Sequence, residues 1–190
     1  MAREPQDLWQ ALSKGGEVLA TEEDYEHGYK REVRQDLQQY VAFRVGNEHY
    51  GLPIADINEI SKQLPTTPVP RTADFVRGIG NVRGSVIPVV DLDRRLGLPQ
   101  MPTDPNQRRI LIVRRQDELY GLVVDEVFAV VTIAPEALED APGALGGPRG
   151  DYIQALARYE GEILIILDLS TVLDPRDFVA KSVRARRSSR

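Results

Sequence analysis

The chain has 190 residues, of which 42% are hydrophobic and 28% charged, and its formal net charge is -5. These values are typical of a globular protein with one domain or two small ones, and the acidic balance argues against a dedicated nucleic-acid-binding protein. The lack of cysteine and the presence of only two histidines exclude disulfides, thiolate nucleophiles and zinc sites built from Cys and His.

The first 38 residues predict a helical extension without the apolar segment of a signal peptide. Between residues 5 and 14 three apolar side chains share one helical face, and two glycines follow where the helix would stop. A second helix begins after Thr21, and its aromatic or apolar residues recur every four positions as far as Leu37. Such a stripe packs on the chain's own domain or docks a partner, and the pattern favours the first.

From Tyr40 onward the pattern becomes alternating and β-branched, which indicates strands, and the chain then repeats itself. A predicted hairpin over 40–54 is matched by another over 110–124, with the shared letters YGL at 50–52 and 120–122. Residues 84–92 are similar in pattern to residues 161–169, and a short helix is predicted at the end of each copy. Several short strands per copy, with few helices, predict a mainly β fold of two small barrels rather than a βαβ sheet.

Three polar segments punctuate these copies. The proline-rich residues 99–107 connect them, and a glycine-rich loop is predicted at 142–150. The final residues 179–190 predict a disordered basic tail, since 181–190 hold five basic residues and no acidic one. Such a tail is solvated or contacts anionic lipid or nucleic acid, and its short, low-complexity composition favours the first. No apolar run reaches the length of a membrane-spanning helix, so we expect a cytoplasmic protein with no direct membrane insertion.

The segment 78–84 superficially resembles a dinucleotide-binding loop, but the third glycine of the fingerprint would fall at Arg83. The loop is therefore either a solvated turn or a binding loop that presents one arginine. Three aspartates, Asp91, Asp125 and Asp168, are candidates for catalysis or metal binding. Asp91 and Asp168 occupy equivalent places in the two copies, each between a strand and a short helix, so we expect them to cap helices. No metal site is predicted, because His27 and His49 have no second ligand at a suitable spacing.

With no catalytic constellation, recognition is the more economical function. Residues 39–175 resemble the CheW-like adaptor domain of bacterial chemotaxis, through YGLPI at 50–54, INEI at 57–60, FVRG at 75–78, NVRG at 81–84, VIPVVDL at 86–92, GLVVD at 121–125 and DL at 168–169.

The resemblance implies a domain over 39–178 made of two five-stranded SH3-like barrels, the first at about 39–100 and the second at about 108–175. It also implies a non-enzymatic scaffold without a cofactor. Such a scaffold links the regulatory domain of a CheA-type histidine kinase to the cytoplasmic tips of methyl-accepting chemoreceptors, and it is recruited to membrane-associated arrays.

The resemblance also assigns residues. The receptor-binding surface would be formed by Ile57, Glu59, Arg83, Gly84 and Val86, with Val127 and Val130 on the second copy. It further implies that Arg83 pairs with Glu59, and that Gly78 lets the chain bend before the NVRG motif.

Two alternatives stay open at this point. A related scaffold could serve an array that controls type IV pili, surface motility or another non-flagellar output. From a different class, a small-ligand-binding barrel or a hydrolase would need convergent polar groups in one pocket.

Overall fold

The computed structural model describes residues 37–141 and 150–180. The predicted upstream helices, the residues 142–149 of the glycine-rich loop and the basic residues 181–190 lie outside the described residues. Eleven strands are assigned in the described part: β1 (Gln38–Val45), β2 (Glu48–Pro53), β3 (Ile57–Ser61), β4 (Thr66–Thr67), β5 (Val76–Val82), β6 (Ser85–Asp91), β7 (Arg109–Arg115), β8 (Glu118–Val124), β9 (Glu126–Ile133), β10 (Ile153–Tyr159) and β11 (Glu162–Leu167).

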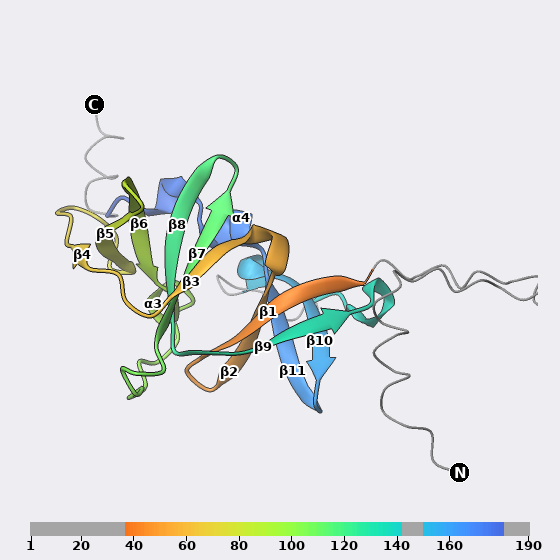
Figure 1. The fold of residues 1–190 in the computed structure, drawn as a ribbon. Coiled ribbons are helices and arrows are strands. Elements are labelled where there is room, and N and C mark those ends of the chain that lie inside the picture. The colour runs from red at the N-terminus through yellow and green to blue at the C-terminus, as the bar shows by residue number, and fades with distance from the viewer. Residues whose placement is uncertain (1–36, 142–149, 181–190) are drawn as a thin grey trace, which may run out of the picture. The chain divides into compact units, whose positions relative to one another are not determined.

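Short helices connect these strands. Two are single α-helical turns, α3 (Leu92–Arg95) and α4 (Leu169–Val172), and four are 3-10 turns: η1 (Ile54–Asp56), η2 (Pro135–Ala137), η4 (Gly150–Tyr152) and η5 (Pro175–Asp177). The strands form two sheets (Figure 1). Sheet A has the order β10-β11-β2-β1-β9, and sheet B has the order β3-β7-β8-β6-β5-β4. The fold is mainly β, as predicted, although each sheet is an open one and sheet B gains the two-residue β4 as a sixth strand.

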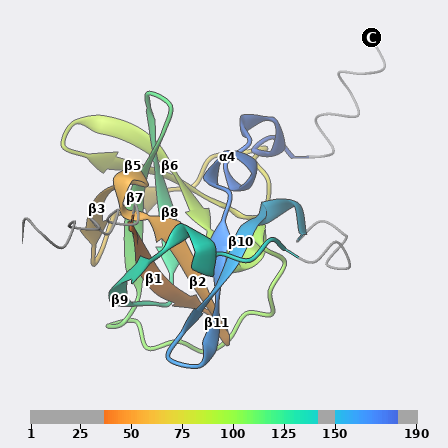
Figure 2. The same cartoon turned by 90° about the vertical axis from the view of Figure 1, so that its right-hand side faces the viewer.

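The two sheets do not follow the two copies of the sequence repeat. The β1–β2 hairpin of the first copy lies in sheet A with β9, β10 and β11 of the second copy. The β7–β8 hairpin of the second copy lies in sheet B with the strands β3 to β6 of the first copy. Parallel pairing joins β11 to β2 and β6 to β8, and Figure 2 shows β11 beside β2. The predicted barrel boundaries, 39–100 and 108–175, are therefore wrong, because the copies exchange their first hairpins.

Chain length explains the exchange. In β8, Val124 lies opposite Arg109 of β7. Val127 is the counterpart of Ile57 in the repeat. In the observed sheet, Ile57 of β3 lies opposite Val113 of β7, so Val127 would have to lie opposite Val113 if β9 paired with β7 in the same way. Val113 lies roughly 14 Å from Arg109 along β7, at about 3.4 Å per residue, and the pairing would have to form on the edge of β7 that faces away from β8. Three residues span at most about 11 Å, so β9 passes to the other sheet and pairs with β1.

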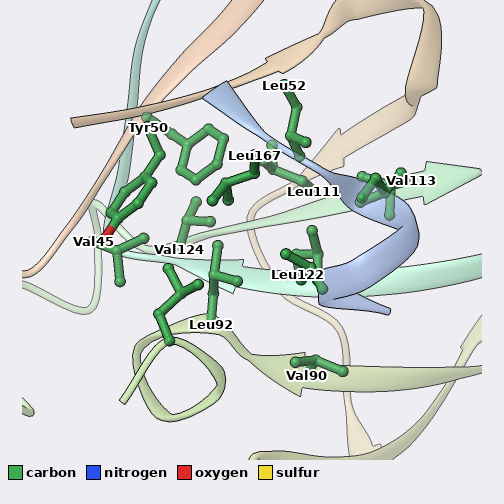
Figure 3. Close-up of a cluster of buried hydrophobic side chains, with 14 of the residues drawn as sticks. Val45, Tyr50, Leu52, Val90, Leu92, Leu111, Val113, Leu122, Val124 and Leu167 are labelled. Carbon is green, nitrogen blue, oxygen red and sulfur yellow. The ribbon is translucent and has the colours of Figure 1, made fainter. Parts of the chain in front are cut away.

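Three clusters of buried apolar side chains hold the fold together. One cluster comes only from sheet A, a second only from sheet B, and the third and largest from both sheets. In β7, Ile110 and Ile112 join the sheet B cluster while Leu111 and Val113 join the shared one (Figure 3). Both faces of this strand are buried, which is why its sequence reads as a continuous apolar run.

The C-terminal boundary lies later than predicted. Val179 forms a β-bridge with Thr72, and the Ala180 amide donates to the Arg71 carbonyl at 3.1 Å. Phe178 anchors this segment by edge contacts with aromatic rings of the domain, including Phe75 at 5.6 Å between centroids. Residues 179 and 180 are therefore part of the folded domain and not of a disordered tail.

Candidate protein-binding site

The turn between β5 and β6 presents Arg83 at the end of sheet B. Arg83 and Gly84 have φ angles of 49° and 90°, and two consecutive positive φ values are what a tight type I′ hairpin requires. The Gly84 amide donates to the Asn81 side-chain oxygen at 2.9 Å, which stabilises the turn. As a result the Arg83 side chain stands out into solvent, 82% exposed.

Arg83 is nevertheless held in one direction. Its Nη2 lies 2.6 Å from Oε2 of Glu59, whose side chain is only 25% exposed. Two strands, β7 and β8, separate β3 from β6 in sheet B. Three strand spacings would put β3 and β6 roughly 14 Å apart in a flat sheet. The ion pair implied by the family resemblance is present, although a flat sheet would keep its two strands too far apart. Sheet B must therefore curl so that its edge strand β3 approaches the β5–β6 turn.

Exposed apolar side chains lie on the same strands that carry this ion pair. Val86 of β6 is 65% exposed and lies opposite Asn81 of β5. Ile79 of β5 and Ile60 of β3 are also exposed, and neither was among the residues predicted from the sequence. Along β5, Ile79 alternates with the buried Gly78 and Gly80, and this burial is known only from the structure. Exposed apolar residues that form one contiguous patch are characteristic of a surface that a partner covers.

The remaining apolar candidates are divided between the two sheets. Val127 and Val130 lie on β9 of sheet A, where Val130 pairs with Val41 and is 54% exposed. Ile57 on β3 and Val127 on β9 are both half-buried against the cluster that the two sheets share. The candidates on sheet B and those on sheet A are therefore connected through this cluster.

Gly78 acts on the backbone rather than on a partner. A Cβ atom at this position would lie 2.2 Å from the carbonyl oxygen of Thr67, and the φ angle of 151° is rarely adopted by other residues. The register of β5 against β6 shifts between Val76 and Gly78, so Arg77 is the extra residue of a bulge. This bulge bends β5 ahead of the NVRG motif, at the place where the family resemblance implies a bend.

The expected capping role of Asp91 needs a correction. Asp91 is the N-cap residue of α3, but its side chain makes no capping hydrogen bond. Its buried carboxylate lies 2.7 Å from Nη2 of Arg77. Asp168, by contrast, accepts a hydrogen bond from the backbone amide of Ser170 at 2.8 Å and from its hydroxyl at 2.6 Å. Burial raises the pKa of Asp168, but hydrogen bonds from Ser170 and Thr171 outweigh it and the net pKa is lowered.

The third aspartate, Asp125, has a structural role. Asp125 is buried and accepts hydrogen bonds from the Gly46 amide at 2.7 Å and from the Thr103 hydroxyl at 2.8 Å. It therefore ties the proline-rich connection to the β1–β2 turn. The ring of His49 packs against Phe128 at 5.1 Å between centroids. Within residues 37–141 and 150–180, no group of three or more His, Cys, Asp or Glu residues is arranged to hold a metal ion.

One surface hollow of about 620 Å³ is lined by a buried arginine. The Arg95 guanidinium lies over the rings of Phe75 and Tyr152, at 4.5 and 4.9 Å from their centroids. Its Nε donates to the Val172 carbonyl at 2.6 Å, and its Nη2 lies 2.9 Å from Asp177. These contacts cap the C-terminal end of α4 and hold η5, so Arg95 stabilises the fold here.

In the part of the chain that the structure covers, no helix is long and apolar enough to cross a membrane.

The domain is a β scaffold with an exposed, oriented arginine and exposed apolar side chains on the same strands, and its buried carboxylates are engaged in structural ion pairs and hydrogen bonds. These features define the class of protein-binding modules. Residues 39–176 match the model of the CheW-like domain, and the chain belongs to this family.

Similar proteins agree with this assignment. The chain is 31% identical to the chemotaxis protein CheW of Bacillus subtilis over 137 residues, which cover 72% of this chain and 87% of that protein. It is 28% identical to CheW of Helicobacter pylori over 151 residues, 80% of this chain and 90% of that protein. The crystal structure of the scaffolding protein TtCheW from Thermoanaerobacter tengcongensis matches with a TM-score of 0.69 and 30% identity, covering 76% of this chain and 98% of that one.

The match to protein PilI of Pseudomonas aeruginosa is more local. It reaches 36% identity over 90 residues, which cover 47% of this chain and 50% of PilI. The comparisons therefore confirm the predicted fold class and place the chain among the adaptors of chemotaxis, in preference to the pilus alternative.

Proposed function

We propose that this chain couples the regulatory domain of a CheA-type histidine kinase to the cytoplasmic tips of methyl-accepting chemoreceptors. It acts as a scaffold without catalysis, in the cytoplasm, at membrane-associated receptor arrays. The observation that carries the proposal is the ion pair of Arg83 with Glu59, on strands of sheet B that also carry exposed apolar residues.

The geometry suits a helical receptor tip. Glu59 holds the guanidinium through Nη2, which fixes its direction while most of the side chain stays exposed to a partner. A guanidinium held in this way offers its other N–H donors at fixed angles and so sets the orientation of a bound helix. Apolar side chains of that helix would cover Val86 on sheet B and Val130 on sheet A. The apolar contacts supply affinity, and Arg83 supplies register.

The kinase partner follows from the family resemblance. The regulatory domain of the kinase has the same fold in this family, so related sheets of the two proteins can pair. Each contact can be weak, since an array multiplies weak contacts by linking them. The type IV pilus array is the second candidate, and the 36% local identity with PilI is the observation in its favour.

The proposal is tested by calorimetric titration of the full chain with the kinase regulatory domain and with a receptor-tip fragment, both encoded in the same genome. Arg83→Ala is expected to weaken receptor-tip binding at least tenfold. Its free energy of unfolding should stay within about 0.5 kcal/mol of the wild-type value, because surface ion pairs contribute little. Arg158 is a suitable control, since it lies on β10 of sheet A, is 71% exposed and has its Nε 3.9 Å from Oε1 of Glu139.

Arg158→Ala is expected to bind the receptor tip as the wild type does. Equal binding by Arg83→Ala would remove Arg83 from the site. A wild-type chain that binds neither partner would contradict the proposed coupling. Titration with the adaptor-binding partners of a pilus array from the same genome would then test the second candidate.

A further inference from the structure

A second arginine lies beside the Arg83 ion pair. Arg114, near the end of β7, is exposed, and its Nη2 donates to the side-chain oxygen of Asn58 at 3.3 Å. The next residue of β3, Glu59, holds Arg83. Consecutive residues of one edge strand thus hold two guanidinium groups, one through a carboxylate and the other through a neutral amide.

A β-bulge places Asn58 in this position. The register of β3 against β7 shifts between Ile57, which lies opposite Val113, and Glu59, which lies opposite Ile112. Asn58 is therefore the unpaired residue of the bulge, next to the strand segment that carries Arg114. Bulges on edge strands redirect a side chain, and here the redirected amide meets Arg114.

The charge of Arg114 is not neutralised within the described residues. Its only hydrogen bond there is to the Asn58 amide, and no carboxylate of residues 37–141 and 150–180 forms an ion pair with it. Asp56 lines the same hollow of about 440 Å³ without forming an ion pair with Arg114. Asp168 and Arg115 line this hollow as well, so the distinguishing feature of Arg114 is that its guanidinium has no carboxylate partner within ion-pair distance in the described part of the chain, whereas Arg83 has Glu59.

The equivalent arginine of the first copy is different. Arg44 on β1 is the counterpart of Arg114. Each arginine lies two residues before a turn residue with positive φ, which is Gly46 at 62° after Arg44 and Gln116 at 55° after Arg114. The Arg44 guanidinium lies 3.2 Å from Glu126 and donates to the Gly46 carbonyl at 2.9 Å. The same strand position is thus neutralised on sheet A and left charged on sheet B.

We propose that Arg114 is a second cationic contact of the receptor-facing surface and that it binds a carboxylate side chain on the helical receptor tip. The inference rests on the proposed function and names the chemistry of its partner: an acidic residue that faces β7 when the helix lies against Arg83. Because the chain is acidic as a whole, this local positive charge also selects a partner and an orientation by electrostatic complementarity.

The test is titration of the full chain with the receptor-tip fragment at low and high salt. Arg114→Ala is expected to weaken binding about threefold and Arg114→Glu about tenfold, in line with exposed ion pairs and their reversal. The differences should shrink in about 0.5 M salt, where screening is short-ranged. Arg158→Glu, on sheet A, is the matched control and is expected to leave binding unchanged.

A second variant leaves the arginine in place. Asn58→Asp would give Arg114 an internal carboxylate, as Glu126 does for Arg44, and is expected to weaken binding about threefold. A receptor-tip fragment with its acidic residues changed singly to lysine should include one that restores binding to Arg114→Glu. Far-UV circular dichroism and urea unfolding verify that each variant is folded.

The two proposals fail differently. If Arg83→Ala loses binding while Arg114→Glu and Asn58→Asp bind as the wild type does, the proposed function stands and the role of Arg114 is overturned. If the wild type does not bind the fragment, both proposals are overturned.

Discussion

The β5–β6 turn of sheet B and the β10–β11 turn of sheet A have the same backbone and different chemistry. The central φ angles are 49° and 90° at Arg83-Gly84, and 51° and 87° at Glu160-Gly161. Exposed apolar residues follow both turns, Val86 in one and Ile163 in the other. The arginine of the first turn is a glutamate in the second. The repeat therefore supplies a frame twice, and the charge placed on the frame distinguishes the two ends.

The two aspartates at the ends of β6 and β11 likewise share the same backbone position but have different side-chain partners. The Asp91 amide donates to Phe75 and the Asp168 amide to Tyr152, each at 2.8 Å. Their carboxylates differ because their neighbours differ. The bulge position on β5 is Arg77, which reaches Asp91, whereas Asp168 is followed by Ser170 and a threonine that donate to it.

The largest expected effect breaks the comparison at the bulge. Gly78 lies opposite Val89, and the equivalent residue of the second copy is Ala155, opposite Ile166. Gly78→Ala is expected to lower the free energy of unfolding by about 2–3 kcal/mol, since the new Cβ would overlap the Thr67 carbonyl. Ala155→Gly should cost only about 1 kcal/mol. Urea unfolding measures both, and equal losses would show that the two positions are sterically alike.

Next in size is the exchange of the Asp91 partner. Arg77→Gln removes the ion pair and leaves Asp91 buried, with Arg94 at 3.9 Å as its nearest remaining cation. We expect a loss of about 1–2 kcal/mol, less than for a fully buried pair because Arg77 is one-third exposed. Adding Asp93→Ser, which imitates Ser170, should recover part of it. No recovery in urea unfolding would mean that Asp91 cannot adopt the capping geometry of Asp168.

A smaller effect concerns Asp168 and is pH-dependent. Asp168→Ala is expected to cost about 1 kcal/mol at neutral pH through the lost cap. The pKa of Asp168 is lowered in the folded protein, so its contribution is present above the ordinary pKa of 3.8 and is lost as the pH falls below it. Thermal unfolding of the wild type and the variant should therefore converge in acid. A constant difference across this range would contradict the role of the ionised carboxylate.

The smallest change in stability is expected at the turns themselves. Arg83→Glu and Glu160→Arg should each alter the free energy of unfolding by less than about 0.5 kcal/mol, because both side chains lie at exposed turns. The double variant moves the arginine to sheet A, where Ala129 of β9 lies at the place of Glu59 and cannot hold it. It should bind the receptor tip no better than Arg83→Glu alone. Recovered binding would show that the two ends are interchangeable.

Much of the fold could be predicted from local patterns. The strands of both copies followed from alternating or continuous apolar residues, and the repeat followed from shared letters such as YGL at 50–52 and 120–122. The ion pair of Arg83 with Glu59 followed from the family motifs. Ile60, Ile79 and Arg114 were missed, because nothing local distinguishes a side chain on an exposed end of a sheet from one on a buried face.

The order of residues alone was enough to predict a duplicated β domain, the turns that end its strands and a candidate binding surface. It did not establish which hairpin belongs to which sheet, since both copies offer the same apolar pattern to a pairing strand. Three-dimensional geometry decided this, because the connections after β2 and β8 are too short to return within one copy. The same geometry put Glu59 and Asn58 of β3 beside Arg83 and Arg114, residues far away in the chain, and so created the charged end of sheet B.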